Sequence, residues 1–167
     1  MSFSQMTLPE FDMEMASTRK CLERVPDDKL DWQPHEKSMS FASLAGHIAD
    51  IPTWVGMTLK ADSFDLAPPD SEPWKSYVAT SQEELLSTFD KNVADARQAL
   101  AEADGVDMGG LWSLLSGDVT HFTMPRAAVL RSMVLNHLYH HRGQLTVYLR
   151  LNGIPLPGIY GPSADEA

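Results

Sequence analysis

The chain has 167 residues, of which 43% are hydrophobic, and this size predicts a single domain over residues 1–167 with a buried core. Its formal net charge of −10 and its lack of a basic stripe exclude nucleic acid as an expected partner, because no surface would release phosphate counterions. No apolar run approaches the roughly twenty residues of a membrane span, and the first residues lack a signal-peptide pattern, so we expect a cytoplasmic protein with no membrane partner.

The first predicted helix begins at a capping box, Thr7–Glu10, with Pro9 in its first turn. Apolar side chains recur at helical steps as far as Val25, and Pro26 is expected to end the helix. The single cysteine, Cys21, lies beside this stripe without an adjacent base, which favours burial over a reactive thiol. Because one cysteine can form neither an internal disulfide nor a cysteine zinc knuckle, any metal must be bound by histidine or carboxylate.

Ser40 is the predicted cap of a second helix, which carries His47 and is kinked or interrupted at Pro52. The stretch from Asp62 to Pro73 is rich in proline and acidic residues and is predicted to be a connecting loop. A second capping box starts at Ser81 and leads into a third helix. The apolar stripe of that helix consists of Leu85, Phe89, Val93, Ala96 and Leu100.

Glycines then punctuate a region in which Leu111–Leu115 and Val119–Thr123 can pair as a small hairpin. Thr123 precedes Pro125, which is expected in the first turn of the longest helix; that helix runs to about Asn152 and stops at Gly153. Four amphipathic helices and almost no strand predict an all-α fold, a four-helix bundle with a short β-hairpin before the last helix. A metal or cofactor site would lie between facing helices.

The last predicted helix places His137 and His141 one turn apart on the same side, where two imidazoles can converge on one divalent metal ion. His47, on the second helix, is the candidate for a third ligand. The alternative is that each ring is a buried imidazole satisfied by a carbonyl or hydroxyl group. Three other histidines rank lower, because His140 is rotated by roughly 100° from His141 and the remaining two lie in expected loops. Those two are His35 and His121.

The segment Asn136–Leu145, followed by Tyr148-Leu149-Arg150, Pro157 and Tyr160–Asp165, resembles the DinB/YfiT-like superfamily, as do Val25–Trp32 and Leu44–His47. The similarity covers nearly the whole chain. The resemblance implies a four-helix bundle, often a homodimer, in which His47, His137 and His141 hold a divalent metal, commonly nickel or zinc in crystals. Characterised relatives include S-transferases and isomerases that use bacillithiol, mycothiol or glutathione. A small-molecule substrate and a low-molecular-weight thiol as co-substrate are therefore the expected partners, although many members have no assigned reaction.

Three neutral imidazoles leave at least one coordination position open, as in catalytic zinc sites. A thiol bound there would become a thiolate nucleophile for group transfer, whereas a bound water would act as hydroxide in hydrolysis. No His-Glu-x-x-His pattern places a general base beside the ligands, which favours transfer. The leading hypothesis is thus a metal-dependent, thiol-dependent transferase. The alternatives are a metal-dependent hydrolase and a non-catalytic binding or stress-response module that the metal stabilises.

Further residues are weaker candidates for roles around the metal. Asp50, one turn after His47, could orient that imidazole or could be a solvated helix charge. Gln144 and Tyr148 follow His141 and could line the pocket or could only pack and cap the bundle. The four tryptophans could wall a ligand cavity or belong to the core, and the sequence leaves both interpretations open. They are Trp32, Trp54, Trp74 and Trp112.

Overall fold

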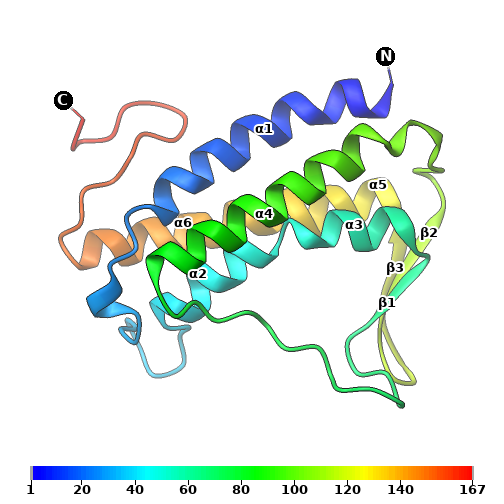
Figure 1. The fold of residues 1–167 in the computed structure, drawn as a ribbon, viewed down its shortest axis with the longest axis horizontal. Coiled ribbons are helices and arrows are strands. Elements are labelled where there is room, and N and C mark those ends of the chain that lie inside the picture. The colour runs from blue at the N-terminus through cyan, green and yellow to red at the C-terminus, as the bar shows by residue number, and fades with distance from the viewer. Residues whose placement is uncertain (1, 167) are drawn as a thin grey trace.

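The computed structural model describes residues 2–166 and is rich in helices, with a small sheet at one end (Figure 1). The helices are α1 (Phe3–Leu22), α2 (Phe41–Asp50), α3 (Thr53–Lys60), α4 (Gln82–Ala101), α5 (Arg126–Val129) and α6 (His137–Leu151). A π-helical segment, Leu130–Asn136, joins α5 to α6, and short 3₁₀ turns occupy Asp27–Lys29 and Ala103–Gly105. The strands are β1 (Ser63–Asp65), β2 (Leu111–Ser116) and β3 (Val119–Pro125).

The starts of α2 and α4 agree with the sequence-based caps, whereas the start of α1 does not. Ser40 caps α2 by accepting from the backbone N–H of Ser43, and Ser81 caps α4 by accepting from that of Glu84. The prediction for α1 is wrong, because the helix begins at Phe3 and not near Thr7. The cap is Ser2, which forms a reciprocal capping box with Gln5. Helix α1 therefore carries Pro9 inside it and ends at Leu22, a turn before Pro26.

The strands contradict the all-α class. The predicted hairpin is confirmed, since β2 and β3 pair in antiparallel fashion around Gly117, whose φ of +57° lies in the left-handed region that favours glycine. The expected loop from Asp62 to Pro73, however, contains β1, which pairs in parallel with β2 from Ser63 opposite Ser113. The sheet is thus three-stranded, in the order β1-β2-β3, and the fold is helix-rich with a small mixed sheet.

The last helical run is interrupted in its hydrogen-bonding pattern. Pro125 ends β3 in an extended conformation and precedes α5, so it does not lie in the first turn of a helix capped by Thr123. The π-helical segment follows, and α6 continues to Leu151. Gly153 has a φ of +69° just after the C-cap Asn152, which confirms the predicted stop.

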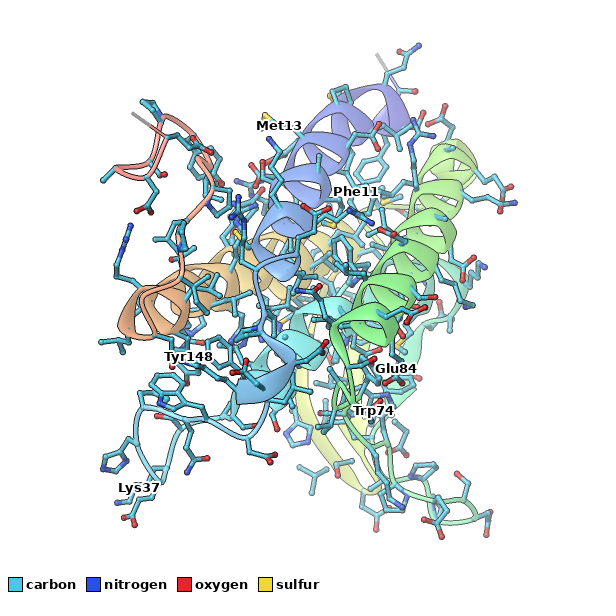
Figure 2. The ribbon with its side chains drawn as sticks, turned by 60° about the vertical axis from the view of Figure 1, so that its left-hand side comes forward. Phe11, Met13, Lys37, Trp74, Glu84 and Tyr148 are labelled. Atoms are coloured by element: carbon cyan, nitrogen blue, oxygen red, sulfur yellow. The ribbon has the colours of Figure 1, made fainter. Side chains whose placement is uncertain are left out.

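Helix α1 packs against α4 and α6, while α2 packs against α4 and α6 and α3 against α4 and the π-helical segment. Figure 1 shows the consequence: α2 and α6, far apart in the sequence, cross behind α4, and the sheet closes one end. The core fills the space between these helices; Phe11 points into it, whereas Met13 on the same helix points outward (Figure 2). Large side chains that are almost fully buried there include Phe11, Phe41, Phe89, Trp112, Leu22, Leu85, Leu138 and Leu145.

None of the helices in residues 2–166 is both long enough and apolar enough to cross a membrane.

Candidate metal centre

Three histidines from two helices meet at the interface of α2 and α6. His47 lies on α2, His137 is the first residue of α6, and His141 follows one turn later. Each ring offers a nitrogen, and the three nitrogens lie within 4.8 Å of one another. The ring centroids are 4.6 to 4.9 Å apart. The structure therefore brings together the three histidines that the sequence proposes as ligands.

The separation of two of these nitrogens fits a tetrahedral ion. Two nitrogens bound to one ion at 2.0–2.1 Å with tetrahedral angles lie about 3.3 Å apart. The Nε2 atoms of His47 and His137 are 3.2 Å apart. These two rings thus already have the separation that a shared metal requires, and all three rings are half-buried, so the cluster keeps access to solvent.

The outer nitrogens of two rings are held by hydrogen-bond acceptors. His137 Nδ1 lies 3.3 Å from the backbone oxygen of Met133, and His141 Nδ1 lies 2.7 Å from Oε1 of Gln144. Because both partners accept, each Nδ1 carries the hydrogen and donates it. Each Nε2 then keeps its lone pair for a metal, which is the arrangement that fixes metal-binding imidazoles in many proteins.

The π-helical segment makes the carbonyl of Met133 available. In an α-helix this oxygen would accept the backbone N–H of His137, four residues later. Here the backbone N–H of His137 instead donates to the backbone oxygen of Ser132, five residues back, and to that of Val134. The ring of His137 can then use the carbonyl of Met133. Single π turns inside α-helices occur frequently at functional sites.

Burial keeps the three imidazoles neutral. It lowers the pKa of His47 to about 4, with further lowering by His141 and His137. Burial also lowers the pKa values of His137 and His141, although the contacts of His137 with Met133 and of His141 with Gln144 act in the opposite direction. Protons therefore compete weakly for these nitrogens near neutral pH, and the donor set suits a divalent ion.

The weaker candidates have different positions. Gln144 contacts His141 as described, so it lies where the sequence places it. The carboxyl group of Asp50 makes no hydrogen bond to His47 among the described residues, and burial raises its pKa. Tyr148 lies two turns beyond His141, where its hydroxyl donates to the backbone oxygen of Met39 and its ring packs against Phe41. Tyr148 therefore contributes to the packing of α2 on α6 and makes no described contact with the histidines.

The remaining histidines lie outside the cluster. His140 is exposed, with its ring 4.9 Å from that of His141, and so lies beside the cluster without pointing into it. His121 is exposed on β3, and His35 accepts a hydrogen bond from the backbone of Lys37 in a loop. Cys21 is fully buried, as the sequence predicts.

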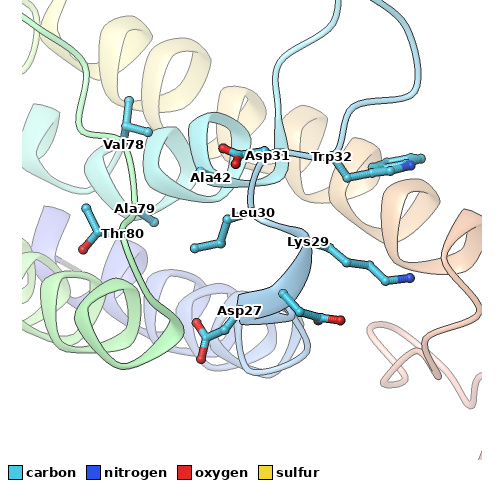
Figure 3. A pocket seen from close by; sticks show the side chains of 10 residues that line it. Asp27, Lys29, Leu30, Asp31, Trp32, Ala42, Val78, Ala79 and Thr80 are labelled. Carbon is cyan, nitrogen blue, oxygen red and sulfur yellow. The ribbon is translucent and has the colours of Figure 1, made fainter.

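The structure also has a cavity of about 420 Å³ (Figure 3). It is lined by residues 27–32, Ala42 and residues 78–80, and none of the three clustered histidines borders it. Of the tryptophans, Trp32 lies at this cavity and also packs on Phe41 and Tyr148, whereas Trp54 and Trp112 belong to the core.

A buried ion pair joins α6 to α1, and local sequence patterns provide little sign of it. Arg142, next to His141, donates to the carboxylate of Glu14 on α1 at 2.7 Å, and both side chains are 4% exposed. Arg142 also donates to the backbone oxygen of Glu14, to Thr18 and to the hydroxyl of Tyr160. The available signal was a charged residue, Glu14, within the apolar stripe of the first helix.

Comparisons with known proteins agree with this fold. The sequence profile of the DinB family matches residues 1–167. The chain is 24% identical over 163 residues to the uncharacterized protein YrdA of Bacillus subtilis, covering 95% of this chain and 89% of that protein. A crystal structure of a DinB-like protein from Bacillus cereus is similar with a TM-score of 0.68 and 25% identity, covering 92% of this chain and 95% of the other. The DinB-like protein YjoA of Bacillus subtilis gives a TM-score of 0.64 at 20% identity, covering 92% and 98%.

Proposed function

The chain belongs to the DinB family, and on this premise we propose that it binds one divalent metal ion through His47, His137 and His141. The observation that carries the proposal is the convergence of three nitrogen donors from α2 and α6, with Nε2 of His47 and His137 only 3.2 Å apart. The donors are neutral imidazoles, which suit zinc and nickel among other divalent ions. Zinc or nickel is the proposed occupant.

The residues around the cluster have separable roles in this proposal. The carbonyl of Met133 and the amide of Gln144 hold the rings of His137 and His141 with Nε2 directed inward. A divalent ion on three imidazoles supplies a Lewis-acidic position that lowers the pKa of a bound thiol or water. The three rings are half-buried, so a small molecule would be able to reach an ion held by them.

We favour a transferase that uses a low-molecular-weight thiol over a hydrolase. Hydrolysis requires a general base beside the bound water, and the carboxyl group nearest in sequence to a ligand, Asp50, makes no described contact with the cluster. A non-catalytic, metal-stabilised module is the other alternative, and it requires only that the folded chain bind metal more tightly than the unfolded chain. The single-domain four-helix bundle, the homodimer and the cytoplasmic location remain predictions that accompany this proposal.

The first experiment measures metal content by mass spectrometry in untagged protein that was purified without nickel-affinity chromatography. The parent is compared with His47→Ala, His137→Ala and His141→Ala, and His35→Ala serves as the matched control because His35 lies in a distant loop. We expect close to one metal ion per chain in the parent and the control, and a loss of metal in the other three. Equal loading in all five proteins would refute the site.

The second experiment separates transfer from the alternatives. The parent protein loaded with metal, and His141→Ala treated in the same way, are each incubated with a panel of electrophiles and low-molecular-weight thiols. The loss of free thiol is followed. Thiol consumption that depends on His141 supports transfer. Consumption of an ester or amide substrate without loss of thiol supports hydrolysis, and the absence of turnover across the panel supports the non-catalytic module.

A further inference from the structure

A backbone segment crosses directly over the glycine that precedes the metal-binding histidine of α2. A Cβ atom built on Gly46 would lie 2.5 Å from the backbone oxygen of Tyr77 and 3.1 Å from the backbone nitrogen of Ala79. Real Cβ atoms essentially never make a contact shorter than 3.0 Å. Glycine also weakens a helix interior relative to alanine, so its presence in the middle of α2 needs a structural reason. The close approach of this segment supplies that reason.

We call residues 74–80 the strap. The strap is the last part of the long connection that returns from the sheet to the start of α4 (Figure 1). Near its end the strap is joined to α2, since the backbone N–H of Ala79 donates to the backbone oxygen of Ala42 at 3.2 Å; Figure 3 shows Ala79 beside Ala42. Ala79 is 4% exposed, so the strap is embedded in the protein at this residue, although most of its other side chains are exposed.

Both ends of the strap are tied to other parts of the fold. At its start, the backbone N–H of Trp74 donates to the backbone oxygen of Leu66 at 2.7 Å. At its end, both the backbone N–H and the hydroxyl of Thr80 donate to the carboxylate of Glu84 on α4. The strap therefore cannot move outward without breaking these bonds, and a side chain at position 46 would push α2 as well as the strap.

Helix α2 has little freedom to move if His47 is to reach α6. To bring the contact at position 46 from 2.5 Å to the ordinary 3.4 Å, the strap and α2 must separate by about 1 Å. Metal–nitrogen distances in proteins tolerate about 0.2 Å. Because His47 follows Gly46 directly, a displacement of this size would carry its ring out of register with His137.

We propose that Gly46 is a positioning residue for the metal centre: the absence of a side chain lets the strap lie against α2, and α2 then presents His47 to His137 and His141. This inference rests on the proposed metal-binding function and deepens it, because it identifies a residue whose lack of a side chain the distance between the two ligand helices depends on. It does not require Gly46 or the strap to touch the metal.

The test compares Gly46→Ala with two matched controls, Gly143→Ala on α6 and Gly56→Ala on α3, where a new Cβ meets nothing within 4 Å. Zinc affinity is measured by competition with a chromophoric chelator, below the unfolding temperature of each variant. We expect Gly46→Ala to weaken zinc binding about tenfold or more, as when residues that orient metal ligands are changed, and the controls to leave it unchanged. The cobalt absorption spectrum reports coordination geometry, which a mere loss of stability would not alter.

A second readout uses protein without added metal. The nuclear Overhauser contact between the rings of His47 and His137 should be present in the parent and both controls and absent in Gly46→Ala. Retention of this contact and of zinc affinity in Gly46→Ala would overturn the proposal. If the parent shows the contact but binds no zinc, the metal-binding function fails, and the ring contact alone decides whether Gly46 positions α2.

A third variant covers the case in which Gly46→Ala does not fold. Two glycines inserted between Lys75 and Ser76, which are both exposed, give the strap enough slack to move away from position 46. Combined with Gly46→Ala, the insertion should restore folding and the ring contact. A combined variant that recovers neither would show that the strap is not the obstacle, and the proposal would be wrong.

Discussion

Glu14→Ala tests whether the buried ion pair behind α6 is energetically important. The carboxylate of Glu14 and the guanidinium of Arg142 lie 2.7 Å apart, and each side chain is 4% exposed. Removing one partner of such a pair leaves the other charge buried without compensation, which costs about 3–5 kcal/mol. Thr18, Tyr160 and the backbone oxygen of Glu14 still accept from Arg142 in the variant. We therefore expect a loss near the lower end, about 3 kcal/mol in the free energy of unfolding.

The assay is equilibrium unfolding in urea, with metal removed from all proteins so that metal binding does not contribute. Asp12→Ala is the matched control, because Asp12 is also on α1 and its carboxylate bonds Arg97, but the two side chains are 43% and 52% exposed. An exposed pair of this kind contributes at most about 1 kcal/mol. The double variant Glu14→Leu/Arg142→Met, which replaces both charges with apolar groups, should be close to the parent in stability.

The reasoning would be refuted by a Glu14→Ala variant that loses no more stability than Asp12→Ala. A double variant as unstable as Glu14→Ala would also contradict it, because the cost would then come from lost packing and not from an unpaired charge. The result bears on function, since Arg142 is the neighbour of His141 and its bonds to α1 fix the rotation of α6.

Three further outcomes are expected. Burial lowers the pKa of His47 from 6.5 to about 4, so between these pH values the unfolded chain binds a proton that the folded chain does not. In urea unfolding, the metal-free protein should therefore be most stable above about pH 6.5 and should lose stability as the pH falls toward about 4. The variant His47→Gln should show a smaller loss. Burial raises the pKa of Cys21 to about 11, so iodoacetamide at about pH 8 should label it only after unfolding, and rapid labelling of the folded protein would contradict its position. Gly143→Ala should raise the free energy of unfolding by about 0.4–1 kcal/mol, because Gly143 lies in the middle of α6 and the new methyl group meets nothing within 4 Å. A loss of stability would show that the space around this position is not open.

Local sequence signals predicted several of the helix ends. Ser40, Ser81 and Gly153 each lie directly beside a long apolar periodic segment, and all three act as predicted. At the start of the chain two capping patterns compete, Ser2 with Gln5 and Thr7 with Glu10. The structure uses the first, and the backbone N–H of Ser4 donates to Asp104 at 3.0 Å. A contact across a hundred residues leaves no trace in the local pattern.

The sheet was predicted only as far as it is local. Strands β2 and β3 are neighbours in the chain, and Gly117 marks the turn between them. Strand β1 has three residues, too few for an alternating pattern, and its partner β2 lies about fifty residues later in the chain. Its position therefore depends on tertiary pairing, for which the acidic and proline-rich composition around it gave no indication.

The candidate site, like the sheet, was predicted most directly from the sequence where its residues are close together in the chain. Helical periodicity alone places His137 and His141 on one face, since the two residues share a helix. His47 was predicted as a third ligand because it lies in a second helical stretch, and the resemblance to a known family supported that prediction, but nothing in the periodicity of α2 says that His47 must face the other two. Gly46 could be seen in the sequence, but the reason for a glycine there is the backbone of the strap, which only the folded structure reveals.

The π-helical segment explains why the side chains of a site can be predicted while their orientation cannot. A π turn differs from an α turn by a shift of one residue in the backbone hydrogen bonds, and no residue type is required for it. In this chain the backbone N–H of His137 donates to the backbone oxygen of Ser132. The carbonyl of Met133 is therefore available to accept from the imidazole of His137. The tautomer of His137, and with it the nitrogen that faces His47, thus depends on a backbone irregularity seven residues long. Three histidines can be located from sequence, but the direction of the lone pair of His137 is a property of the backbone between α5 and α6.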